Sequence, residues 1–135
     1  MYLIRYLGKY HIIRVAFFGV LHGMDDVVPM MKDLTAALKE HSCHRILFDL
    51  RKTRIVDKYD EIFKLGINAA EYGFSRDHRA AILFSEDEQK LRVLERVLTD
   101  RSYEMQLFRN ENAALIWLNQ LDSSDRSNSQ DFILS

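Results

Sequence analysis

The spacing of apolar residues constrains the fold most strongly, because two strand-like runs precede a regular alternation of helix-like and strand-like segments. Residues 1–7 and 10–18 are rich in Tyr, Ile, Val and Phe, and Gly8-Lys9 between them fits a tight hairpin turn. Helical periodicity then recurs in segments that end near His41, at Gly73, after Leu98 and at Leu121. Compact apolar runs separate these segments, at 45–50, 79–84 and 103–109.

This order predicts an α/β fold: a β-hairpin followed by βαβ units, giving a mostly parallel sheet with four helices packed on it. Asp25 and Asp26 are expected to cap the first helix, which places Pro29 in its first turn. Ser85 opens a Ser-x-x-Glu capping box, and Asn110 is expected to cap the last helix. In such sheets ligands bind beyond the carboxyl ends of the strands.

The chain length of 135 residues suits a single domain, which we assign to residues 1–121. Residues 122–135 are mostly Ser, Asp, Asn and Gln, and are expected to form a disordered tail. A net charge of -1 gives no general attraction to nucleic acid or anionic membranes. The chain contains no apolar run long enough to span a bilayer and no secretory signal, and its single cysteine excludes an intrachain disulfide framework. We therefore expect a cytoplasmic protein.

Four segments carry a resemblance to a known family: Gly19-Val20-Leu21, Arg45-Ile46-Leu47-Phe48-Asp49-Leu50-Arg51, Ala80-Ala81-Ile82-Leu83-Phe84 and Glu111-Asn112-Ala113-Ala114-Leu115-Ile116-Trp117-Leu118. In this order they resemble the STAS family of bacterial anti-sigma-factor antagonists, and more closely its SpoIIAA-like branch, which is compared with Sec14-type domains. The resemblance covers about residues 10–121 and implies a STAS-like fold in a bacterial regulatory or interaction protein.

The resemblance also implies a control site at the start of the second helix. Classical antagonists have an Asp-Ser-Ser-Gly-like stretch there, and its serine is a phosphorylation switch. Asp57 falls on the Asp of that motif, but Lys58-Tyr59-Asp60 replaces Ser-Ser-Gly. Because only Tyr59 offers a hydroxyl, the resemblance implies the fold and a binding surface rather than the same pathway.

The densest basic stretch follows the strand at 45–50 and contains Arg51, Lys52, Thr53, Arg54 and Lys58. Arg and Lys beside a helix N-terminus suit a phosphate or carboxylate. A solvated loop neutralised by neighbouring carboxylates is the alternative interpretation. Together with His22, Asp57 and Tyr59, these residues form the predicted binding edge for a protein partner or a small anionic ligand.

Several motifs do not support catalysis or metal binding. His41-Ser42-Cys43-His44 offers three potential zinc ligands, but no second ligand pair matches it. The chain has no phosphate-binding Gly-rich motif and no nucleophile elbow. We expect no catalytic residues, metal or organic cofactor.

Three functions remain open. The first is a noncatalytic domain that binds a protein partner or a small anionic ligand, with a homodimer as one form. The second is a carrier or sensor of a hydrophobic, lipid-like molecule, held by apolar helix faces that contain Met30, Met31, Phe63, Phe74 and Trp117. The third is a small enzyme that uses His22 with Arg51 or Arg54 on an anionic substrate. Phe132-Ile133-Leu134 is also able to dock onto an edge strand.

Overall fold

A computed structural model describes residues 1–120, so the expected tail and the Phe132-Ile133-Leu134 segment lie outside the described residues. The elements alternate as the sequence predicts: β1 (Tyr2–Leu7), β2 (Ile12–Leu21), α1 (Gly23–Glu40), β3 (Arg45–Ile55), α2 (Tyr59–Ile67), a 3-10 turn (Ala69–Tyr72), β4 (Arg79–Leu83), α3 (Glu88–Asp100), β5 (Glu104–Phe108) and α4 (Glu111–Leu118). Within residues 1–120, no helix combines the length and apolarity needed to cross a membrane.

The strands form one five-stranded sheet in the order β1-β2-β3-β4-β5. β1 pairs antiparallel with β2, and every later neighbour is parallel. The parallel pairs need crossover connections, and the helices supply them. The predicted mostly parallel sheet with an opening hairpin is therefore confirmed.

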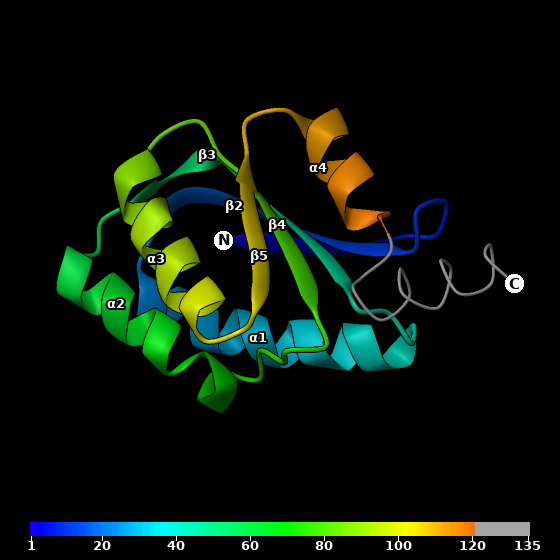
Figure 1. Cartoon of the computed structure of the whole chain (residues 1–135), viewed down its shortest axis with the longest axis horizontal. Helices are drawn as coiled ribbons and strands as arrows, with labels where there is room; N and C mark the ends of the chain where they lie inside the picture. The colour runs from blue at the N-terminus through cyan, green and yellow to red at the C-terminus, as the bar shows by residue number, and fades with distance from the viewer. Residues whose placement is uncertain (121–135) are drawn as a thin grey trace, which may run out of the picture.

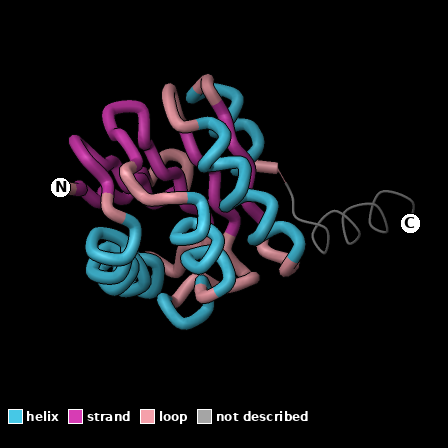
Figure 2. The backbone as a smooth tube through the Cα atoms, turned by 90° about the vertical axis from the view of Figure 1, so that its left-hand side faces the viewer, coloured by secondary structure: helices cyan, strands magenta, loops and turns pink. Residues whose placement is uncertain are grey.

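The helices cover the two faces of the sheet unequally (Figure 1). α1, α2 and α3 pack on one face over the large core, which includes the fully buried Ile13, Leu34 and Ile46. α4 alone packs on the other face, over a small cluster centred on Leu47 and Leu118. Figure 2 shows the strands of the N-terminal hairpin at the outside of the molecule. We call the uncovered part of β1, β2 and the end of β3 on the α4 side the open face.

β2 and β3 are longer than the sequence suggests, which changes the setting of the basic stretch. Gly19 and Arg51–Arg54 were expected in loops, but Phe18–Leu21 pairs with Lys52–Ile55 as a continuation of the sheet. A register shift between Ala16 and Phe18 interrupts the alternation. A strand can carry polar side chains where it faces water, so an apolar run alone underestimates the length of the strand.

Two helix starts also differ from the prediction. α1 begins at Gly23 with His22 as N-cap, so Pro29 lies inside the helix rather than in its first turn. α3 is capped by Asp87, whose backbone is left-handed with φ 61°, and not by Ser85. The Asp87 carboxylate instead accepts a 2.9 Å hydrogen bond from the backbone of Ile55. This long-range bond gives Asp87 a partner that the local capping pattern does not reveal.

Candidate binding surfaces

The structure distributes the predicted binding residues over three places rather than one edge. Arg51 and Lys52 lie on the open face, where both line a groove. Thr53 donates a 2.7 Å hydrogen bond to the carbonyl of Leu50, which is a local backbone contact. Arg54 is exposed on the same strand. Consecutive strand residues ordinarily point to opposite sides, but the register shift between β2 and β3 brings Arg51 and Lys52 into the same groove.

Asp57 is a structural residue at the junction of α1 and α2. It is the only buried charged side chain in residues 1–120, and its carboxylate accepts a 2.7 Å hydrogen bond from the backbone N–H of Gly23. This bond satisfies one of the free donors at the start of α1 and places a negative charge at the positive end of the helix. Asp57 therefore links the starts of the two helices and is too enclosed to contact a large partner.

His22, Lys58 and Tyr59 are exposed at the same helix starts. The backbone N–H of His22 donates to Asp26 and that of Lys58 donates to Glu61, so both carboxylates serve the helix termini. Within residues 1–120, the His22 imidazole makes no hydrogen bond, whereas Arg51 pairs with Asp49 and Glu111 on the open face. Neither Arg51 nor Arg54 therefore forms a hydrogen bond with His22 in the described part of the chain.

Exposed apolar side chains surround these helix starts, and they include Phe63, which the sequence-based alternative of a lipid-like ligand placed on a ligand-holding helix face. Large apolar residues stay between 38% and 48% exposed on α1, on the turn before α2 and along α2, and we call this set the α1–α2 surface: Met24, Val28, Val56, Tyr59, Phe63 and Ile67. On α2, Tyr59, Phe63 and Ile67 follow each other at helical spacing, so they share one side of the helix. Clustered exposed apolar residues mark an interaction surface.

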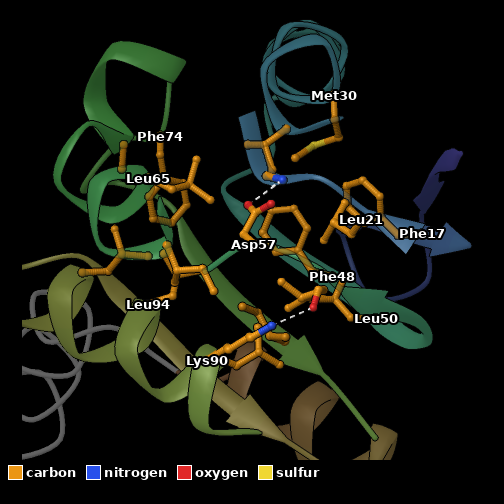
Figure 3. Close-up of a pocket in the computed structure, with 18 of the residues that line it drawn as sticks. Phe17, Leu21, Met30, Phe48, Leu50, Asp57, Leu65, Phe74, Lys90 and Leu94 are labelled. Atoms are coloured by element: carbon orange, nitrogen blue, oxygen red, sulfur yellow. Dashed lines mark hydrogen bonds between the residues drawn. The ribbon is translucent and has the colours of Figure 1, made fainter. Parts of the chain in front are cut away.

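A cavity of about 120 Å³ lies between the sheet and helices α1, α2 and α3 (Figure 3). Phe17, Met30, Phe48, Phe74 and Leu94 are among its apolar walls. Polar residues also line it: Asp57, Tyr72, whose hydroxyl donates to the sulfur of Met24, and Lys90, whose ammonium donates a 2.9 Å hydrogen bond to the Ile55 carbonyl. The polar contacts are satisfied by the protein, so the empty space itself has an apolar character.

The groove on the open face has a volume of about 250 Å³ and a mixed lining. Leu3, Ala16 and Phe18 supply apolar surface, with Leu3 54% and Phe18 38% exposed. Arg5 and Arg14 join Arg51 and Lys52 as cations, and Asp49 is the carboxylate of the lining. Arg5 and Arg14 were not predicted from the sequence. Period-two alternation nevertheless puts Arg5 on the same side as Leu3, and Arg14 on the same side as Ala16.

Asp49 organises two of the groove cations. Arg14 pairs with both Asp49 and Glu111, and Arg51 contacts Asp49 at 2.8 Å and Glu111 at 3.7 Å. Burial alone would raise the pKa of Asp49, but hydrogen bonds from Arg51 and the charges of Arg51 and Arg14 outweigh burial and lower this pKa. The carboxylate therefore stays ionised and fixes both guanidinium groups.

Residues 41–44 make separate contacts with different parts of the structure. His41 stacks on Tyr6, with ring centroids 4.0 Å apart. Cys43 is buried, and its thiol donates to the carbonyl of His11 at 3.2 Å. His44 lies near His78. Three residues with ligand chemistry are thus adjacent in sequence but do not form a cluster of metal ligands within residues 1–120.

Comparisons with solved structures agree on the fold. The chain is similar to the anti-sigma factor antagonist SpoIIAA in its unphosphorylated form, with a TM-score of 0.55, 12% identity, and coverage of 90% of this chain and 100% of that one. It is also similar to an uncharacterised protein from Shewanella loihica, of the DUF3478 family with a SpoIIAA-like fold, with a TM-score of 0.56, 19% identity and coverage of 87% and 92%. The phosphorylated form of the Bacillus cell fate determinant SpoIIAA matches with a TM-score of 0.52 and 12% identity, over 84% of this chain and 96% of that one.

No family model and no curated protein sequence matches the chain. The structural matches nevertheless define a SpoIIAA-like α/β domain, the fold of the STAS family, as the sequence resemblance implied. At identities of 12% and 19% the likeness establishes the fold, and the function has to be argued from the surfaces of this chain.

Proposed function

We propose that this protein is a noncatalytic regulatory domain that binds a protein partner through the α1–α2 surface. The exposed apolar side chains Tyr59, Phe63 and Ile67 on one side of a short helix are the observation that carries the proposal. Burying such side chains stabilises a complex, and aromatic residues are common at the centre of interfaces. Lys58, the exposed N-cap residue of α2, adds a positive charge at the start of this helix.

The structural neighbours agree with this proposal. SpoIIAA is an anti-sigma factor antagonist, which implies that a domain of this fold acts through another protein. The start of α2, where the family resemblance places a phosphorylated serine, carries the exposed Tyr59 in this chain. We infer that binding here depends on apolar contact and on the charge at the helix start rather than on serine phosphorylation. Its cytoplasmic location and a homodimeric form remain predictions.

The test compares two apolar-to-acidic variants. Phe63→Asp places a charge on the α1–α2 surface, whereas Ile116→Asp places one on α4, where Ile116 is 65% exposed on the other side of the sheet. Affinity capture from cell extract, quantified by mass spectrometry, should retain a specific protein with the wild type and Ile116→Asp and lose it with Phe63→Asp. Size-exclusion chromatography of the purified proteins shows whether the lost partner is a second copy of this chain. Equal capture by both variants would contradict the proposal.

A second candidate function is the binding of a small apolar ligand, and the cavity between the sheet and α1–α3 favours it. An engineered apolar cavity of about 150 Å³ binds benzene, so the 120 Å³ in this domain suits a ring or a short alkyl group. A complete lipid would require the helices to move apart. A cavity of this volume thus suits an apolar group much smaller than the lipid-like ligand that the sequence suggested.

Benzene and toluene are suitable probes of the cavity. Ala69 lines it, and Ala69→Leu should fill part of the space and abolish the thermal stabilisation that these probes give the wild type. The matched control is Ala113→Leu, on the exposed side of α4. If neither probe stabilises the wild type, the cavity does not serve small apolar ligands, and the partner-binding proposal is unaffected.

A further inference from the structure

We propose that the groove on the open face binds an extended acidic segment of a partner protein. This surface is separate from the α1–α2 surface, since it lies on the side of the sheet that carries α4. α4 packs over Leu47, Ala81 and Leu83, whereas Leu3 of β1 and Phe18 of β2 stay exposed on the same side of the sheet. The groove therefore begins at the edge of the area that α4 covers.

The strand register orders the side chains of the groove in rows. Arg5 pairs with Arg14 in one row, and Leu3 pairs with Ala16 in the next. Phe18 and Lys52 form a third row. The apolar row of Leu3 and Ala16 thus separates the cations Arg5 and Arg14 from Lys52. Arg51 also lines the groove.

The charge of the groove selects an anionic occupant. Four cations line it against the single carboxylate of Asp49, and Glu111 adds one more negative charge at the rim. Arg14 and Arg51 are already held by these carboxylates, whereas Arg5 and Lys52 form no ion pair within residues 1–120. Two fixed and two available cations give an excess of positive charge in a chain with a net charge of -1.

The row spacing defines the segment that fits. Arg14 and Phe18 are four residues apart on β2, which corresponds to about 13 Å along a strand. In an extended peptide, residues at alternate positions share one side and repeat with the same rise. An acidic residue, an apolar residue two positions later and a second acidic residue two positions after that match the three rows.

The apolar content of the groove argues for a peptide over a nucleic acid. Sheets that bind single-stranded nucleic acid present two or three aromatic rings for base stacking. Phe18 is the one aromatic side chain in the lining that is exposed, because Phe17 is 4% exposed and belongs to the opposite core. Leu3 and Ala16 instead provide aliphatic contact for a side chain.

The test uses the full chain with a synthetic peptide, acetyl-Asp-Ser-Phe-Ser-Asp-amide, and follows backbone amide shifts by NMR. The shifts should concentrate at Leu3, Arg5, Ala16, Phe18 and Lys52, and binding should weaken as salt is added. A peptide of the same composition in the order Asp-Asp-Ser-Ser-Phe should bind more weakly, because its acidic residues do not match the rows. Equal binding of both peptides would overturn the proposed register, and no binding of either would overturn the site.

Variants separate the groove from general charge effects. Arg5→Ser with Lys52→Ser should raise the dissociation constant about tenfold, since each exposed ion pair contributes about 0.7 kcal/mol. Lys39→Ser with Lys64→Ser removes the same charge from exposed positions on α1 and α2, and should leave binding unchanged. Equal weakening by both pairs would contradict a specific site.

Two competitors test the class of ligand. Inorganic phosphate that displaces the peptide and reproduces its shifts at equal affinity would make the groove a small-anion site. An oligothymidine that binds more tightly at the same residues would make it a nucleic-acid site. Either result overturns the peptide proposal and leaves the α1–α2 surface to be judged by its own variants.

Discussion

The two faces of the sheet differ in how completely they are covered, and each exposes a different kind of surface. Three helices cover one face, where close helix contacts coexist with a 120 Å³ cavity. Gly66 of α2 lies so near α3 that an added Cβ would approach Val97 to 2.8 Å. One short helix covers the other face, where cations and carboxylates line the boundary with solvent. The face covered by three helices thus contains an apolar cavity, whereas the partly covered face carries a charged groove.

The largest effect should come from removing the contact that holds the single helix on the sparsely covered face. Leu118→Ala should lower the free energy of unfolding by about 3 kcal/mol, because the side chain is fully buried in the small cluster under α4. Leu34→Ala is the matched truncation in the large core under α1–α3. Urea titrations followed by circular dichroism should give single transitions of similar cost. A separate early transition in Leu118→Ala would show that α4 unfolds independently of the sheet.

The next effect concerns the Gly23–Asp57 contact beside the cavity. A Cβ at residue 23 would lie 2.1 Å from the Asp57 carboxylate, although the backbone of Gly23 is not left-handed. Gly23→Ala should therefore destabilise the domain by about 2 kcal/mol through this clash alone. Asp57→Ala relieves the clash but leaves a buried N–H unpaired.

A double-mutant cycle sharpens this assignment. The combined cost of Gly23→Ala and Asp57→Ala should be smaller than the sum of the two separate costs, because the second change removes the cause of the first. Strictly additive costs in urea titrations would show that the two residues act independently, and that the start of α1 is held by other contacts.

His78, in the loop before β4, and Asp49 on the open face should also respond to acid at different pH. Burial lowers the pKa of His78, and the nearby charge of His44 adds to this effect. Its folded pKa lies below the ordinary value of 6.5, so the unfolded chain binds more protons and stability declines as the pH falls below that value. Asp49 on the open face also has a lowered pKa, so its contribution is present above the ordinary pKa of 3.8 and is lost in stronger acid.

Thermal unfolding across the pH range separates these contributions. His78→Gln should flatten the decline between pH 7 and the acid range, and Asp49→Asn should reduce the dependence only near and below about pH 4. Arg96→Gln, an exposed change on α3, is the control and should leave both regions of the profile unaltered. If His78→Gln leaves the profile unchanged near neutral pH, the burial of His78 does not contribute to the pH dependence.

The order of the elements was predictable from sequence because each strand and helix carries its own apolar period. Asn110 illustrates this success: its side chain accepts from the backbone of Ala113, as the cap prediction requires. The sites were less predictable because they depend on long-range contacts. Asp87 bonds the end of β3, Asp57 bonds the start of α1, and Arg14 of β2 pairs with Glu111 of α4. No local pattern encodes these partners.

The exposed basic and apolar residues show the same limit. The run from Arg51 to Arg54 was a candidate site as a block, but of this run only Arg51 and Lys52 line the groove, and Thr53 donates to the Leu50 carbonyl instead. Phe63 has helical spacing and was grouped with the helix faces that would hold a lipid-like molecule, yet it is 48% exposed because α2 turns its Ile62 and Gly66 side inward. Periodicity predicts that a helix has an apolar side, but not which of two apolar sides is covered.

The smallest expected effect tests whether the cavity between the sheet and α1–α3 is a packing defect or a ligand site. Ala69→Leu adds apolar volume to the cavity wall and should raise the free energy of unfolding by about 0.5–1 kcal/mol if the helices need not move. A loss of stability would show that the cavity is too narrow at this point, since overpacking forces strain. A gain in stability together with lost binding of benzene would show that the domain keeps the space at the expense of stability, which is the pattern expected of a ligand site.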